Sequence, residues 1–167
     1  MNRRIVIVGF MGSGKTTVAR ALAERLTCEM IDLDSFITER EGRSPAEIIR
    51  ANGEPVFREI ESLALSDVLQ HRNIRVAALG GGTWTIPANR TLIALHNCLS
   101  VWLDVPFDLC WNRITTSNAV RPLAPDRENT QRLYDTRREN YQLAAVRIPV
   151  SESDRPEVLA DRILTQG

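Results

Sequence analysis

The sequence has almost no lysine: of its 21 basic residues, 20 are arginine, and Lys15 is the single lysine. An N-K-x-D motif, which guanine-selective GTPases share, therefore cannot occur, and this argues against a switch-type GTPase. Cysteine is also scarce. The three cysteines are far apart and form no C-x-x-C pair, which argues against a zinc site and a disulfide framework and favours free thiols.

Charge of one sign is not in excess either, since 21 acidic residues balance the 21 basic ones. A general nucleic-acid binder usually has a basic excess, so we expect no nucleic-acid partner. The longest apolar runs, such as Ile5–Val8, are far shorter than the ~20 residues of a membrane span. We therefore expect no membrane association and a cytoplasmic location.

The length of 167 residues fits one domain covering residues 1–167. A hydrophobic content of 43% and a charged content of 25% exclude disorder as the main state. Buried strands are predicted at residues 4–8, 30–34, 74–79, 99–105 and 146–150. Helices are predicted at residues 15–26, 45–52, 54–70, 87–95, 106–115, 130–145 and 155–164, with a polar loop at 116–129. This alternation predicts an α/β domain with a parallel sheet and helices on both faces.

In the predicted helix 54–70, apolar residues indicate which side faces the core. Val56, Ile60 and Leu63 form one line, and the residues beside it are Phe57, Ala64 and Val68. Together these six residues form the apolar side of the predicted helix.

Residues 9–16 have the sequence G-F-M-G-S-G-K-T, which fits the phosphate-loop pattern G-x-x-x-x-G-K-[ST]. Its glycines let backbone N–H groups converge on phosphate oxygens, and the helix that follows directs its positive dipole end to the same point. Lysine and threonine add an ammonium for the phosphates and a hydroxyl for Mg²⁺. We predict that ATP contacts Gly12, Ser13, Gly14, Lys15, Thr16 and Thr17. A glycine-rich turn without a ligand is the alternative.

Two carboxylates, Asp32 and Asp34, end the second predicted strand. Side chains two apart on a strand share a face, and the carboxyl ends of parallel strands are where α/β proteins bind ligands. Both are therefore expected near the phosphate loop. Acids in a solvated turn are the alternative.

Three weaker features follow along the chain. Arg58 and Glu61 are neighbours on one predicted helix and could form an ordinary surface ion pair or part of a site. Gly80, Gly81 and Gly82 follow a strand and allow either a close approach to a ligand or a tight strand exit. Arg121 lies in the polar loop, either solvated or placed to close over phosphates.

Taken together, the order and spacing of these motifs resemble shikimate kinase. The resemblance rests on the phosphate loop, D-L-D, F-R-E-I-E at residues 57–61, G-G-G, R-P-L in the loop, and an arginine four residues before Tyr141. It implies a three-layer P-loop kinase fold with strand order 2-3-1-4-5, an acceptor-binding segment at 33–61 and a mobile lid at 112–127. It also implies ATP-dependent phosphorylation of the 3-hydroxyl of shikimate, in the biosynthesis of aromatic amino acids through chorismate.

The resemblance further implies residue roles at the nucleotide. Lys15 would contact the transferred phosphate, Thr16 would bind Mg²⁺, and Asp32 would help to place that ion. Arg121 would reach the phosphates when the lid closes, and Arg113 is the nearest candidate for an arginine against adenine.

At the acceptor, the resemblance implies that Asp34 binds a shikimate hydroxyl and acts as the base. Arg58 and Arg137 would hold the carboxylate, although the adjacent Arg138 is an alternative to Arg137. Glu61 would orient Arg58, and the glycines 80–82 would offer backbone contacts. Shikimate and ATP are the expected partners of a monomer. A kinase of another small polar molecule, such as gluconate or a nucleoside monophosphate, and a nucleotide-binding domain without catalysis remain open.

Overall fold

A computed structural model describes residues 3–118 and 121–166 and contains a five-stranded parallel sheet. Its order, β2-β3-β1-β4-β5, confirms the predicted order. The strands are β1 (Ile5–Val8), β2 (Glu29–Asp32), β3 (Ile74–Ala78), β4 (Leu99–Asp104) and β5 (Val146–Pro149). Strands β1 and β4 are buried along their whole length, as expected when helices cover both faces of a parallel sheet.

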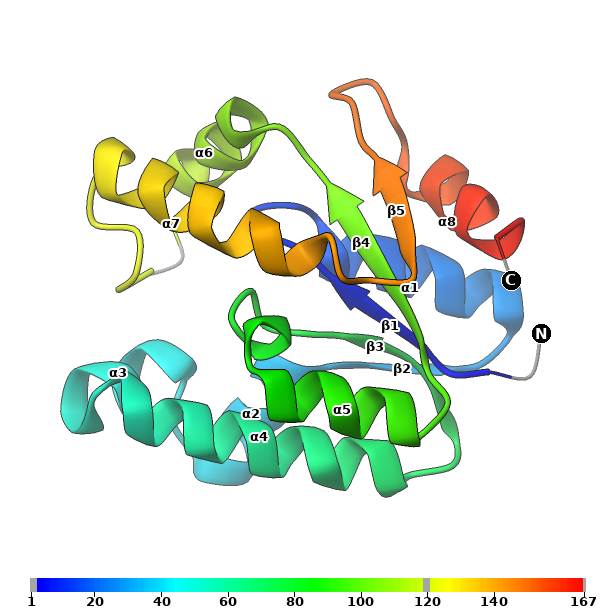
Figure 1. Cartoon of the computed structure of the whole chain (residues 1–167), viewed down its shortest axis with the longest axis horizontal. Helices are drawn as coiled ribbons and strands as arrows, with labels where there is room; N and C mark the ends of the chain where they lie inside the picture. The colour runs from blue at the N-terminus through cyan, green and yellow to red at the C-terminus, as the bar shows by residue number, and fades with distance from the viewer. Residues whose placement is uncertain (1–2, 119–120, 167) are drawn as a thin grey trace.

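The helices form the two outer layers. They are α1 (Lys15–Leu26), α2 (Leu33–Glu41), α3 (Pro45–Asn52), α4 (Glu54–Gln70), α5 (Pro87–Leu95), α6 (Phe107–Thr116), α7 (Arg127–Tyr141) and α8 (Pro156–Leu164), with a short 3-10 turn η1 (Thr83–Thr85). Helices α1 and α8 pack together on one face, whereas α4, α5 and α7 cover the other (Figure 1). None of the helices in residues 3–118 and 121–166 is long and apolar enough to cross a membrane.

The second strand ends two residues earlier than predicted, and a helix that was not predicted follows it. Asp32 is the last residue of β2 and also caps α2, because its Oδ1 accepts a hydrogen bond of 3.0 Å from the Ser35 N–H. Asp34 therefore lies in the first turn of α2. The prediction that both carboxylates share one strand face is wrong, although both still lie at the carboxyl edge of the sheet.

The apolar stripe predicted on helix α4 is buried only in part, at Phe57, Ala64 and Val68. Val56 and Leu63 of this stripe are 39% and 59% exposed. The buried residues of α4 are Phe57, Glu61, Ala64, Leu65, Val68 and Leu69. The buried side of α4 also carries the carboxylate of Glu61, which has polar partners there.

The segment between α6 and α7 carries the predicted lid. Helix α6 extends to Thr116 and α7 begins at Arg127, with Asp126 as its cap. The predicted lid 112–127 therefore begins inside α6 and ends at α7, and the connecting loop covers residues 117–126. Positions 119–120 of this lid lie outside the described residues.

Candidate active site

The phosphate loop connects β1 to α1 and turns the N-terminus of α1 toward the carboxyl edge of the sheet. Gly14 caps α1 in the left-handed conformation, with φ of 86°, which favours glycine. Gly12 has φ of 75°, and a Cβ there would lie 2.7 Å from the carbonyl oxygen of Cys110 in α6. The loop is thus held against α6 at its back and leaves the N–H groups of the α1 N-terminus open for an anion.

Lys15 folds over this loop. Its Nζ donates a hydrogen bond of 2.8 Å to the carbonyl oxygen of Phe10 and lies 3.5 Å from Ser13 Oγ. Burial lowers the pKa of Lys15 to about 8, against the opposing effect of the nearby carboxylate of Asp34. The lysine remains largely protonated at neutral pH and available to an incoming phosphate.

Thr16 and Asp32 meet where the loop joins α1. The Thr16 hydroxyl donates to Asp32 Oδ2 at 2.5 Å, while Asp32 Oδ1 is used by the cap of α2. A hydroxyl and a carboxylate oxygen at the end of a phosphate loop are the donors that Mg²⁺ prefers. The pair fits a magnesium ion held jointly with phosphate oxygens.

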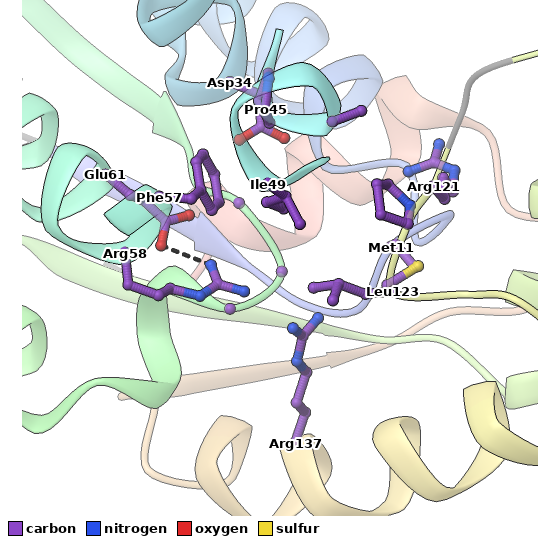
Figure 2. A pocket seen from close by; sticks show the side chains of 15 residues that line it. Met11, Asp34, Pro45, Ile49, Phe57, Arg58, Glu61, Arg121, Leu123 and Arg137 are labelled. Atoms are coloured by element: carbon purple, nitrogen blue, oxygen red, sulfur yellow. Dashed lines mark hydrogen bonds and ion pairs between the residues drawn. The ribbon is translucent and has the colours of Figure 1, made fainter. Parts of the chain in front are cut away.

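Beside the phosphate loop is a cavity of about 120 Å³. Figure 2 shows that it gathers side chains from both sides of the molecule, with α2, α3 and α4 on one side and the α6–α7 loop and α7 on the other. Its polar lining includes Asp34, Arg58, Glu61, Arg121 and Arg137; its apolar lining includes Met11, Ile49, Phe57 and Leu123. The combination suits a small polar acceptor with an apolar ring.

Arg58 is held by two carboxylates of its own helix. Glu61 Oε2 accepts from Nη1 at 2.7 Å, and Glu54 Oε1 accepts from Nη2 at 3.0 Å and from Nε at 3.2 Å. Each terminal nitrogen keeps one further N–H, so the outer edge of the guanidinium remains available to a carboxylate. Figure 2 shows this guanidinium beside the cavity. The Arg58–Glu61 pair is therefore part of the site and not a surface ion pair.

The three glycines after β3 lie against functional side chains. A Cβ at Gly82 would be 2.3 Å from Arg58 Nη2, and one at Gly80 would be 2.6 Å from Glu61 Oε1 and 3.0 Å from Asp34 Oδ1. At Gly81, a Cβ would lie 3.1 Å from Arg137 Nη1. None of the three needs a left-handed backbone. Glycine is required here because neighbouring side chains lie too close for a Cβ, and not because of the backbone conformation.

Arg137 and Arg138 have different surroundings although they are adjacent. Arg137 is 6% exposed, and its guanidinium points from α7 into the cavity, near that of Arg58 (Figure 2). Burial lowers its pKa, and no carboxylate of the described residues forms an ion pair with it. Arg138 instead pairs with Asp104 at 3.0 Å, away from the cavity. Of the two candidates, Arg137 is therefore the one that faces the site.

Asp34 stands in the wall of this concave site with its carboxylate facing the opening. Asp34 keeps an exposed surface, but desolvation of its carboxylate, together with the charges of Asp32 and Glu61, raises the pKa of Asp34 to about 6. Lys15 and Arg58 oppose the rise. The carboxylate is mostly ionised at neutral pH but poised to accept a proton.

Two more arginines lie near the phosphate loop. Arg121 lines the cavity, and its Nε is buried without a hydrogen-bond partner within the described part of the chain. Arg113 Nη1 donates to the carbonyl oxygen of Gly12 at 3.2 Å, so its guanidinium lies beside the loop. The structure thus places Arg113 against the phosphate loop and Arg121 in the wall of the neighbouring cavity.

Some functional neighbours were missed in the sequence. Glu54 holds Arg58 from one helical turn away, and its i, i+4 spacing was a usable signal. Thr83 donates to Glu61 Oε1 at 2.6 Å, and no local pattern indicates this contact between distant residues. Trp84 is buried outside the cavity and donates from Nε1 to the carbonyl oxygen of Asn140.

Comparison with known proteins shows which family the chain resembles. The family model described as shikimate kinase matches residues 11–166. A shikimate kinase from Synechococcus elongatus is 39% identical over 96% of this chain and 84% of its own. The structure of shikimate kinase from Acinetobacter baumannii in complex with shikimate has a TM-score of 0.90 and 32% identity, covering 98% of this chain and 92% of that one. The shikimate kinase of Aquifex aeolicus has a TM-score of 0.80 and 30% identity, covering 98% and 94%.

The fold and the phosphate loop beside an acceptor cavity define a P-loop kinase of small molecules. Within that class, the relatives reported above, which match nearly the whole chain, are shikimate kinases. The chain belongs to the shikimate kinase family.

Proposed function

We propose that this chain transfers the γ-phosphoryl group of ATP to the 3-hydroxyl of shikimate, with the side chains around the cavity in the roles given below. One observation carries the proposal beyond family membership. Two guanidinium groups, Arg58 from α4 and Arg137 from α7, meet at one cavity, and Arg137 is nearly buried without a carboxylate partner in the described chain. A buried cation of this kind calls for an anionic ligand.

The acceptor carboxylate would bind between the two arginines. Arginine suits this task because its planar fork donates two parallel hydrogen bonds to a carboxylate. Glu54 and Glu61 fix the fork of Arg58, and Gly82 leaves room for it. With the carboxylate held there, the ring would lie against Ile49 and Phe57, and its hydroxyls would point toward Asp34.

Asp34 would accept the hydrogen bond of the reacting hydroxyl and take up its proton as the phosphoryl group arrives. Phosphoryl transfer has a loose transition state, so alignment and charge neutralisation matter more than the strength of the base. Lys15 and Arg121 would neutralise charge on the phosphates. When bound between Thr16 and Asp32, Mg²⁺ would supply further neutralisation of the phosphate oxygens.

The loop that carries Arg121 would exclude water, which otherwise competes with the acceptor as nucleophile. Its Pro122 and Leu123 already line the cavity. We also propose that the enzyme acts as a cytoplasmic monomer. All side chains used here come from one chain, and the three cysteines are free thiols, which suits a reducing compartment.

The test is ADP release from ATP and Mg²⁺ with a panel of acceptors: shikimate, gluconate, a nucleoside monophosphate, and none. We expect release that depends on shikimate, and a product phosphorylated at the 3-hydroxyl by NMR. A better acceptor than shikimate would replace the proposed substrate. Tight ATP binding without turnover on any acceptor would instead indicate a nucleotide-binding domain.

A further inference from the structure

The last turn of α7 is tied to the glycine loop after β3. Tyr141 donates its hydroxyl proton to the carbonyl oxygen of Gly81 at 2.5 Å. One residue earlier, the carbonyl oxygen of Asn140 accepts from Trp84 Nε1 at 3.0 Å. These contacts join two segments that are 60 and 56 residues apart in the chain.

Tyr141 and the arginine that faces the cavity both meet the same glycine. Tyr141 lies one helical turn after Arg137, so the two side chains are neighbours on α7, and a Cβ at Gly81 would lie 3.1 Å from Arg137 Nη1. The tyrosine is 2% exposed, and burial raises its pKa far above the usual range, so the hydroxyl keeps its proton. The Tyr141 hydroxyl therefore holds the backbone of Gly81 at the point where the guanidinium of Arg137 packs on it.

We propose that Tyr141 is a positioning residue of the acceptor site, which sets the guanidinium of Arg137 relative to the glycine loop. This inference rests on the proposed function. The tyrosine hydroxyl holds the Gly81 carbonyl, and the guanidinium of Arg137 lies against Gly81, so the position of the glycine loop relative to Arg137 depends on this hydrogen bond. Without the hydroxyl, Arg137 keeps its charge and its place on α7, but the loop is no longer tied beside it.

Tyr141→Phe tests the proposal, because phenylalanine fills the same buried space without the hydroxyl. We expect KM for shikimate to rise about tenfold, the upper range for one hydrogen bond, with kcat and KM for ATP within about twofold of the original values. The matched control is Tyr134→Phe. Tyr134 also lies on α7 and donates to a carbonyl oxygen, that of Val105, at 2.9 Å, but it does not line the cavity. This control should leave KM for shikimate unchanged.

A double-mutant cycle separates positioning from general stability. In an Arg137→Ala background, Tyr141→Phe should change KM for shikimate by less than about twofold, because the group it orients is already gone. An equal rise in that background, or an equal loss toward shikimate and ATP, would indicate a structural role and overturn the inference. So would an active Tyr141→Phe enzyme with unchanged KM. A wild-type enzyme without shikimate-dependent turnover would overturn the proposed function itself.

Discussion

Two adjacent arginines show how the surroundings of one side chain decide its chemistry. Arg137 and Arg138 have the same charge, and the sequence left open which of them faces the acceptor. A step of one residue on a helix turns a side chain by about 100°. Arg138 thereby reaches the carboxylate of Asp104, while Arg137 enters the cavity and has the burial and the free charge of a ligand-binding group.

The adjacent pair allows a matched test. Arg137→Ala should raise KM for shikimate about 10- to 100-fold, the range for charge-assisted hydrogen bonds, with KM for ATP unchanged. Arg138→Ala removes the same charge from the same helix turn and should leave KM for shikimate within about twofold. Steady-state kinetics with each substrate varied would measure both. A larger effect from Arg138→Ala would reverse the assignment.

The shifted pKa values predict the pH dependence of the reaction. Asp34 must be ionised to accept a proton, and its pKa is raised to about 6. The kcat/KM for shikimate should therefore fall as the pH drops through 6. Lys15 must be protonated to bind phosphate, and its pKa is lowered to about 8, so kcat/KM for ATP should fall as the pH rises through 8. Asp34→Asn should abolish turnover. If the variant stayed active and its kcat/KM still fell below pH 6, that result would contradict the role of Asp34.

The glycine loop after β3 is closely packed by charged side chains. Gly82→Ala would place a methyl group 2.3 Å from Arg58 Nη2, so the guanidinium must leave its position between Glu54 and Glu61. The backbone conformation at Gly82, φ of −97°, suits alanine. We therefore expect a folded variant, checked by circular dichroism, with KM for shikimate raised about tenfold or more. If Gly82→Ala kept the kinetics of the unchanged enzyme, Arg58 would be able to bind the acceptor from another position.

Helix α4 depends on Glu61 for stability as well as for the site. Glu61 is fully buried and accepts from Arg58 and from Thr83. Removing one partner of a buried ion pair leaves the other unpaired, so Glu61→Ala should lower the free energy of unfolding by about 3 kcal/mol. Urea denaturation would measure it. Glu59 is exposed on the same helix, so Glu59→Ala serves as the control and should change the free energy of unfolding by no more than about 0.5 kcal/mol. Equal losses of stability in the two variants would contradict the role of the buried ion pair.

The elements also show where sequence patterns fail. Helices 45–52 and 87–95 were predicted with their observed ends, because capping and proline signals mark them locally. The structure of the D-L-D segment was not predicted correctly, because a strand ends and a helix begins within it. Asp32 is both the last residue of β2 and the cap of α2. The apolar stripe on α4 included the exposed Val56 and Leu63 and left out Glu61, whose burial depends on a partner that lies far away in the chain.

For the whole molecule, the parallel sheet explains why distant motifs share one site. The loops after β1, β2 and β3 all leave the same edge of the sheet, which brings the phosphate loop, Asp34 and the glycines together. Strand order was predicted by resemblance to a family, since no local pattern specifies which strands are neighbours. The contacts of α7 with the glycine loop likewise depend on the completed fold.

We propose that Arg58 and Arg137 bind the acceptor by its carboxylate. The most direct measurement is the ratio of kcat/KM for shikimate to that for its methyl ester, which keeps the ring and hydroxyls but lacks the charge. Loss of charge-assisted bonds to Arg58 and Arg137 predicts a ratio of about 100 or more. A ratio near one would contradict the account, because the two guanidinium groups would then contribute nothing to recognition of the acceptor.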